Sequence, residues 1–189
     1  MMDIVIPKNN EEEFISMAEK LGYNELYFLY GFNDYLDKGK FEIKNRKIKI
    51  NIGVLVDNKN INKVRKLKNE KAFVVAKSSG NDKEVIEKLK QNIIFSFEGS
   101  LRKDFIHQRA SGLNHILCRS AKENNVTIGF SSSSILNTEN KGVILGRIKQ
   151  NIKLCKKFKV KTIIASFAEK PFDMRSVHDV ASLFTILNG

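Results

Sequence analysis

The sequence predicts an α/β fold, a (β/α) barrel with about seven parallel strands ringed by helices. Apolar runs of strand length alternate with helical patterns from one end of the chain to the other. Many of these runs are almost entirely apolar, as in IVI, LYFLY, FVVA and TIIAS, which is typical of parallel strands covered on both faces. The even spacing of the helical patterns favours a barrel over a doubly wound open sheet, the alternative for this rhythm.

Seven segments are predicted to be strands because each is a short apolar run. They cover residues 2–6, 25–30, 48–56, 72–77, 93–97, 126–131 and 161–166. In a parallel barrel, ligand-binding residues cluster just after the strands, at the carboxyl rim. We therefore expect functional side chains in the loops that follow these segments.

The segments between the strands carry signals of helices. The first helix is expected after Asn10, a good capping residue, because three glutamates follow where a helix dipole is positive. Gly22 provides its end. Apolar stripes at helical spacing predict two more helices within residues 61–67 and 85–89.

The longest helical pattern runs from about Gly142 to Phe158. One side of this helix is predicted to be buried through Ile144, Ile148, Ile152 and Cys155. The opposite side is predicted to carry exposed cations, namely Arg147, Lys149, Lys153, Lys156 and Lys157. Core packing and anion binding would then occupy opposite faces of one helix.

The net charge of +12 is distributed unevenly. Residues 1–37 are acidic, whereas cations concentrate in residues 38–49, 59–71 and 147–161, and the last stretch holds no acidic residue. A solvated lysine-rich face explains any single stretch equally well. Because like charges without counter-charges repel, three such stretches together favour an anionic partner such as nucleic acid.

No feature of the sequence divides the chain. Its two prolines lie outside any linker rich in glycine or serine, so residues 1–189 are expected to form a single domain. Charged residues interrupt every long apolar run, and the first residues do not resemble a signal peptide, so we expect no membrane association. Cys118 and Cys155 occupy apolar positions of helical patterns, as reduced thiols of a cytoplasmic protein do.

Several kinds of catalytic site lack their motifs. GxGxxG, Walker-type and GxSxG sequences are absent, which excludes the corresponding nucleotide sites and the serine hydrolase elbow. Ser131–Ser134 follow a predicted strand and offer hydroxyl groups to an anion, although a polar loop is the commoner meaning.

Metal-dependent phosphoester hydrolysis is the main enzymatic alternative. A polynuclear metal site needs several histidines and carboxylates that converge on the rim, and the chain holds three histidines. One of them, His107, follows the fifth predicted strand in a candidate rim cluster. The other members of that cluster are Glu98, Arg102, Asp104 and Arg109.

Three longer motifs narrow the range of possible functions. They are DFIHQRASGLNHILCRSAKENNVTIGFSSSSIL at 104–136, LGRIKQNIKLCKKFKVKTIIASFA at 145–168 and MRSVHDVASL at 174–183. Together they closely resemble the archaeal ribonuclease P protein component 3 family, which is shared with the eukaryotic nuclear enzyme. Val177 departs from the family pattern, which usually has proline there.

The resemblance implies a TIM-barrel-like relative of the PHP phosphoesterases in which the metal machinery is lost. The PHP enzymes carry HxH at the first strand, where this chain has Asp3 and no histidine. The family acts in an RNA-based endonuclease that removes 5′ leaders from precursor tRNA. The implied partners are the ribonuclease P RNA, protein component 2, other protein subunits of the complex and precursor tRNA. The RNA is the catalyst and uses magnesium, so we expect no cofactor, metal or catalytic residue in this chain.

Motif and position together predict the residues that bind RNA or a protein partner. They are Arg102, His107, Gln108, Arg109, Arg147, Lys153, Lys156, Lys157 and Arg175. Arginine suits bidentate contact with phosphate, and cations that neutralise phosphates release counterions. Two alternatives stay open, an independent PHP-type metal phosphoesterase and a basic RNA-binding barrel with another target.

Overall fold

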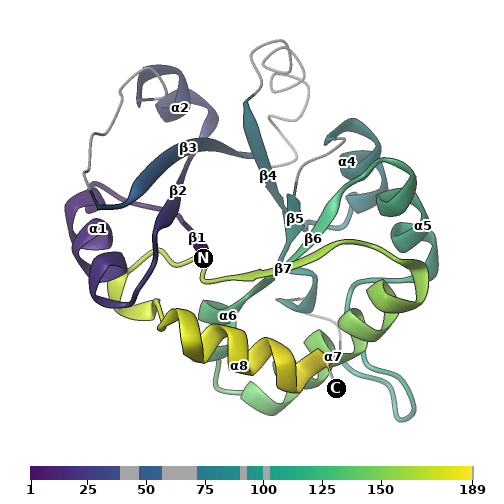
Figure 1. Cartoon of the computed structure of the whole chain (residues 1–189). Coiled ribbons are helices and arrows are strands. Elements are labelled where there is room, and N and C mark those ends of the chain that lie inside the picture. Colours follow the sequence, from purple (N-terminus) through teal and green to yellow (C-terminus); the bar gives the residue numbers. More distant parts are fainter. Residues whose placement is uncertain (39–46, 57–71, 90–92, 100–102, 189) are drawn as a thin grey trace.

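The computed structural model describes residues 1–38, 47–56, 72–89, 93–99 and 103–188. Seven parallel strands lie side by side in the order of the sequence, with helices outside them (Figure 1). The strands are β1 (Met2–Val5), β2 (Glu25–Tyr30), β3 (Lys49–Val56), β4 (Phe73–Lys77), β5 (Ile93–Phe95), β6 (Thr127–Ser131) and β7 (Thr162–Ala165). The predicted α/β barrel fold is therefore confirmed. The fifth strand ends earlier than expected because Ser96 takes a positive φ of 70°.

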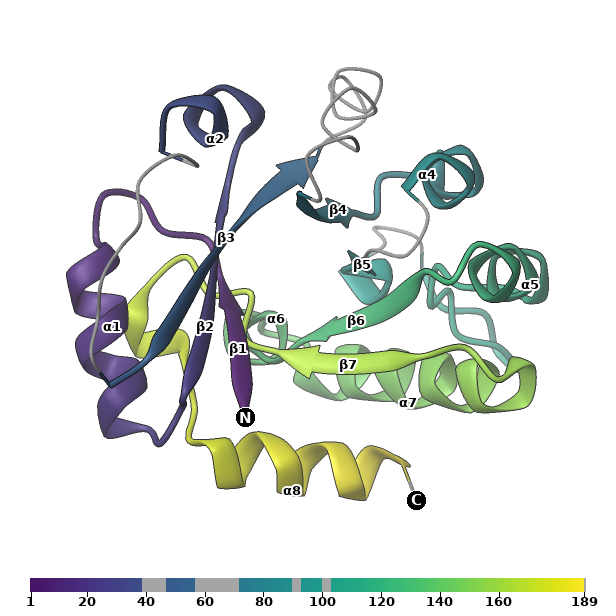
Figure 2. The same cartoon turned by 45° about the horizontal axis from the view of Figure 1, so that its top comes forward.

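The helices and turns between the strands follow the same alternation. They are α1 (Glu11–Lys20), α2 (Phe32–Lys38), α4 (Asp82–Leu89), η2 (Phe97–Gly99), α5 (His115–Glu123), α6 (Ser132–Leu136), α7 (Lys141–Phe158), η3 (Pro171–Asp173) and α8 (Val177–Asn188). Helices α4, α5, α7 and α8 pack on one another in sequence around the outside (Figure 2). The helix expected at 61–67 lies outside the described residues. In the described part of the chain, no helix is long and apolar enough to span a membrane.

The start of α1 differs from the expected cap. Asn10 precedes the helix, but its side chain makes no capping hydrogen bond and instead accepts the Lys8 N–H at 2.8 Å. Gly22 follows the helix with φ of 84°, as the sequence predicts.

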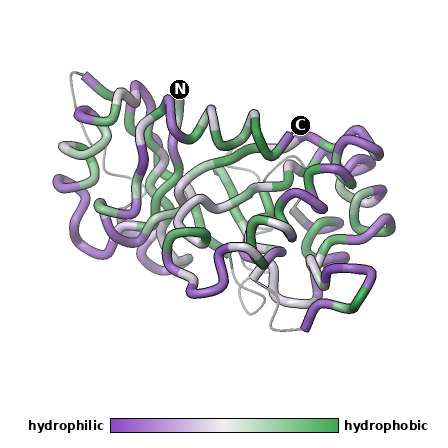
Figure 3. Tube along the Cα trace, turned by 90° about the horizontal axis from the view of Figure 1, so that it is seen from below, coloured by the Kyte–Doolittle hydropathy of each residue, from purple (hydrophilic) through white to green (hydrophobic). Residues whose placement is uncertain are grey.

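Alternate residues of the strands point to opposite faces. In β2, Tyr27 and Leu29 belong to the barrel interior, whereas Leu26 and Phe28 pack toward α1. Stacked rings of Phe95 and Phe167, with centroids 4.0 Å apart, fill part of the interior. Figure 3 shows the same division, with hydrophobic residues along the central strands and hydrophilic residues along much of the periphery.

The sheet nearly closes into a barrel where β1 meets the residues just after β7. Phe167 N–H donates to the Ile4 carbonyl at 2.7 Å, and Ile6 N–H donates to the Ala168 carbonyl at 2.8 Å. A side chain completes this seam, because Asp3 Oδ1 accepts the backbone N–H of Ser166 at 2.6 Å. Asp3 is fully buried, and its Oδ2 has no hydrogen-bond partner in the structure.

We expect Asp3 to make stability depend on pH. Desolvation raises the pKa of Asp3 from 3.8 to about 6, although hydrogen bonds from Ser166 and Ile4 oppose the shift. Between these values the folded state binds more protons than the unfolded state, so stability falls as pH rises, by up to about 3 kcal/mol.

Urea denaturation of the wild type and of Asp3→Asn between pH 4 and 7 measures this dependence. The wild type should lose stability relative to the variant as pH rises through 4 to 6. Parallel curves for the two proteins would contradict the burial-raised pKa. Burial also raises the pKa of Glu98. Because Glu98 is present in both proteins, its contribution to the pH dependence cancels in the comparison.

Candidate nucleic-acid interface

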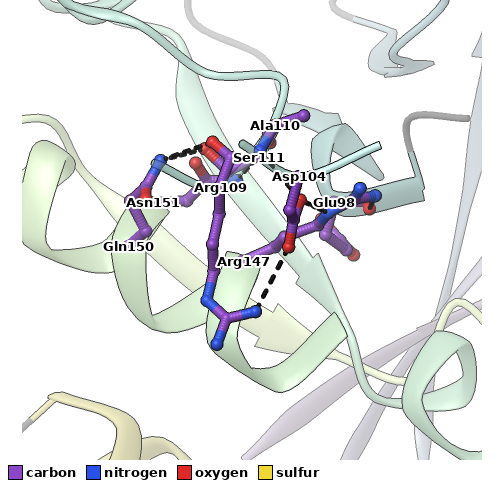
Figure 4. Close-up of polar contacts among 8 residues, drawn as sticks. All are labelled: Glu98, Asp104, Arg109, Ala110, Ser111, Arg147, Gln150 and Asn151. Atoms are coloured by element: carbon purple, nitrogen blue, oxygen red, sulfur yellow. Dashed lines mark hydrogen bonds and ion pairs between the residues drawn. The ribbon is translucent and has the colours of Figure 1, made fainter. Parts of the chain in front are cut away.

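The loop at residues 103–114, here the docked loop, is bound to α7 at the carboxyl rim (Figure 4). Asp104 is its first anchor. Asp104 Oδ1 accepts Arg147 Nε at 2.9 Å and the Ala110 N–H at 2.8 Å, and Oδ2 accepts Arg109 Nη1 at 3.2 Å. Although desolvation opposes the shift, these hydrogen bonds and the charge of Arg147 lower the pKa of Asp104.

A second anchor holds the end of the docked loop on the next turn of α7. Gln150 Nε2 donates to the Arg109 carbonyl at 3.1 Å and to Ser111 Oγ at 2.8 Å. The buried Asn151 donates through Nδ2 to the Ser111 carbonyl at 2.9 Å. The QN pair of one motif thus binds the RAS segment of another, so the two motifs form a single structural unit.

Arg147 is not on the exposed face of α7, which corrects the prediction from the sequence. It is only 5% exposed, and besides its bond to Asp104 it donates through Nη1 to the Glu98 carbonyl at 3.0 Å. The guanidinium therefore ties η2, the docked loop and α7 together. Its structural role is to position the loop.

Gly146 allows the side chain of Arg109 to lie directly against α7. A Cβ at this position would lie 2.4 Å from Arg109 Cζ, which is closer than nonbonded atoms approach. The space above Gly146 is thus occupied by a guanidinium that also binds Asp104.

We expect Gly146→Ala to displace the Arg109 side chain without unfolding the protein. Alanine favours the helix by about 1 kcal/mol over glycine, which offsets loss of the exposed Arg109–Asp104 pair. Limited proteolysis of the docked loop should accelerate while the melting temperature changes little. Gly142→Ala in the same helix, where a Cβ has nothing within 4 Å, is the matched control and should leave proteolysis unchanged.

The anchors leave the apex of the docked loop exposed. Phe105 and Ile106 are 71% and 95% exposed, and His107, Gln108 and Arg109 are exposed as well. The structure therefore brings three of the predicted site residues together on one braced loop.

The remaining predicted residues that the structure describes lie in two places. Lys153, Lys156 and Lys157 are exposed on the second half of α7, where Lys156 donates to the Asn188 carbonyl of α8. Arg175 is exposed before α8, away from this cluster, and its own carbonyl accepts the Tyr23 hydroxyl at 2.9 Å. Arg102 lies outside the described residues.

The serine run serves the fold rather than forming an open loop. Ser131 ends β6 and caps α6 by accepting the Ser134 N–H, and it also donates to the Ser166 carbonyl at 3.1 Å. Ser134 Oγ donates to the buried carboxyl group of Glu98 at 3.3 Å. Within the described ranges, no cluster of three or more histidine, cysteine, aspartate or glutamate side chains has a geometry that could hold a metal ion.

The fold defines the chain as a TIM-barrel-like α/β barrel, and a phosphatase shares this fold. Histidinol phosphate phosphatase from Lactococcus lactis, solved with zinc, histidinol and phosphate, superposes with a TM-score of 0.67 at 11% identity. That match covers 98% of this chain and 93% of the phosphatase.

The family model of RNase P subunit p30 matches residues 1–188. The chain therefore belongs to the RNase P subunit p30 family, whose members are protein subunits of ribonuclease P, a tRNA-processing endoribonuclease. The resemblance noted in the three motifs is thus confirmed.

Individual relatives agree with this assignment. Ribonuclease P protein component 3 of Methanocaldococcus jannaschii is 27% identical over 197 residues, covering 98% of this chain and 82% of the relative. Its counterpart in Methanosarcina acetivorans is 35% identical over 77 residues, covering 40% of this chain and 32% of the relative. A chain in the cryo-EM structure of archaeal ribonuclease P with mature tRNA has a TM-score of 0.77 at 24% identity, covering 97% of this chain and 82% of that chain.

Proposed function

We propose that this chain binds the RNA subunit of ribonuclease P together with protein component 2 and supports removal of 5′ leaders from precursor tRNA. In this role the RNA is the catalyst and uses magnesium, and the chain binds no cofactor of its own. The chain would act in the cytoplasm alongside the other protein subunits.

The observation that carries the proposal is the exposed basic face of α7 beside the docked loop. Lys149, Lys153, Lys156 and Lys157 are exposed there, in a stretch without acidic residues. Cations that neutralise phosphates release counterions, and this stabilises a folded polyanion without reading its bases. Structured RNA is recognised largely through its shape and backbone, which suits a fixed array of cations.

The exposed residues of this region are the proposed contacts to RNA or to the protein partner. They are His107, Gln108, Arg109, Lys153, Lys156 and Lys157, with Arg175 and Arg102 as separate candidates. Arg147 acts through the docked loop instead, because it is buried.

We expect Lys153→Glu to lower cleavage of precursor tRNA about 3- to 10-fold at low magnesium and little at high magnesium, where the metal screens the phosphates. The assay combines the RNA subunit, component 2 and this chain, with reactions that omit each of them. Lys170→Glu makes the same change of charge at an exposed site outside this face and is the matched control.

The omitted-component reactions separate the alternatives. Cleavage that requires the RNA and increases with the protein pair supports the proposal. Cleavage by the chain alone would support a metal phosphoesterase, and the absence of any stimulation would support an RNA-binding barrel with another target. Equal loss in Lys153→Glu and Lys170→Glu would contradict the assignment of the α7 face.

A further inference from the structure

A pocket of about 500 Å³ opens between α5, α7 and the docked loop. Its apolar part consists of Leu113, Leu154 and the ring of Phe158. Its polar part comes from three segments far apart in the sequence, with Gln108 from the docked loop, His115 and Arg119 from α5, and Lys157 from α7. We name this site the α5–α7 pocket.

The charge of the α5–α7 pocket is entirely positive. No carboxylate is among the described residues that line it. Arg119 Cζ and Lys157 Nζ each lie 5.9 Å from the centroid of the Phe158 ring. Two cations thus lie over one aromatic ring among the residues that line this concave site.

The combination of apolar walls, an aromatic ring and two cations suits a ligand that has both an aromatic ring and a negative charge. An aromatic ring and apolar walls stack a planar base, and two neighbouring cations neutralise the phosphate attached to it. Gln108 and His115 add side chains that can hydrogen-bond to the edge of a base. A paired base in a helix is already stacked on both faces, so a duplex cannot place a base in this pocket without opening.

We propose that the α5–α7 pocket binds a single unpaired nucleotide of RNA. The base lies against Phe158, and its phosphate lies between Arg119 and Lys157. This inference rests on the proposed function, because it gives that function a site where the protein distinguishes single-stranded from paired RNA. The docked loop supplies Gln108, so the anchors on α7 also set one wall of the pocket.

The test is the binding of the full chain to two labelled RNA probes, a short oligouridylate and a blunt-ended duplex of the same length, by fluorescence anisotropy over a range of salt. Phe158→Leu should weaken oligouridylate binding about 5- to 20-fold with little change in the salt dependence, because it removes the aromatic ring but no charged group. Phe158→Tyr, which keeps an aromatic ring, should bind oligouridylate as the wild type does. Arg119→Ala with Lys157→Ala should weaken binding and lower the salt slope by about 0.7, since the two cations neutralise one phosphate and each neutralised phosphate contributes about 0.7 on a single strand.

The duplex is the internal control, because other cations on the surface bind it. Duplex affinity should change less than two-fold in Phe158→Leu. Lys170→Ala, outside the pocket, should leave the binding of both probes unchanged, and thermal melting identifies any variant that fails to fold.

Three results would overturn the proposal. Unchanged oligouridylate binding in the pocket variants would show that the pocket is not used. Equal weakening for both probes would show that these residues belong to a diffuse basic surface. If the pocket variants lost association with component 2 but still bound oligouridylate, the pocket would be a binding site for protein instead. Failure of the proposed function appears separately, as wild-type protein that does not stimulate cleavage of precursor tRNA.

Discussion

Replacing Asp104 by alanine should lower the free energy of unfolding by about 3 kcal/mol, the lower end of the cost of leaving a buried charge without its partner. Asp104 is the carboxylate beside Arg147, whose guanidinium is only 5% exposed. Without that carboxylate a desolvated positive charge loses its counter-charge. The same substitution frees the Ala110 N–H and Arg109, so the docked loop should also become sensitive to protease.

Urea denaturation followed by circular dichroism measures the change. Glu169→Ala is the control, because it breaks an exposed ion pair. The side chains of Glu169 and Lys8 are 51% and 65% exposed, so this loss should cost less than about 1 kcal/mol. Adding Arg147→Met to Asp104→Ala should recover part of the loss, because an apolar side chain of similar length replaces the unpaired charge. A loss no larger than that of Glu169→Ala would contradict the role of this pair.

The second large effect is expected from Gly112→Ala at the end of the docked loop. Gly112 has φ of 79°, and a Cβ there would lie 2.4 Å from the Phe97 carbonyl oxygen. Since the obstacle is backbone, no side chain can move aside to relieve the contact. The strained φ and the overlap together should cost about 3 kcal/mol in the free energy of unfolding.

Gly80→Ala separates the two contributions to this effect. Gly80 also has a positive φ, 99°, but a Cβ there has nothing within 4 Å. It should therefore cost about 1 kcal/mol, from the backbone conformation alone. Equal losses in the two variants would show that the docked loop does not press against η2.

The sequence predicts the barrel well because strand burial leaves a strong apolar pattern. All seven predicted strands are present, and Ile148, Ile152 and Cys155 of α7 are buried as expected. The pattern is less informative at the edge of the buried face. Ile144, one of the four residues expected there, is only partly buried.

Arg147 and Asn151 could not be placed from the sequence. They lie one helical turn apart on the side of α7 that faces the docked loop, so their burial depends on polar partners about 40 residues away. Apolar periodicity predicts which residues meet other apolar residues, and it carries no signal for a helix face that binds a loop. The motifs that contain these residues mark them as a group, but only the structure shows that the two motifs are in contact.

The barrel seam has a consequence for synthesis of the chain on the ribosome. Asp3 and Ser166, which meet at the seam, are 163 positions apart. The edge of β1 that does not pair with β2 therefore has no partner until nearly all of the described residues have been translated. An unpaired strand edge can pair with strands of other chains, so the nascent chain should be prone to aggregation for most of its synthesis.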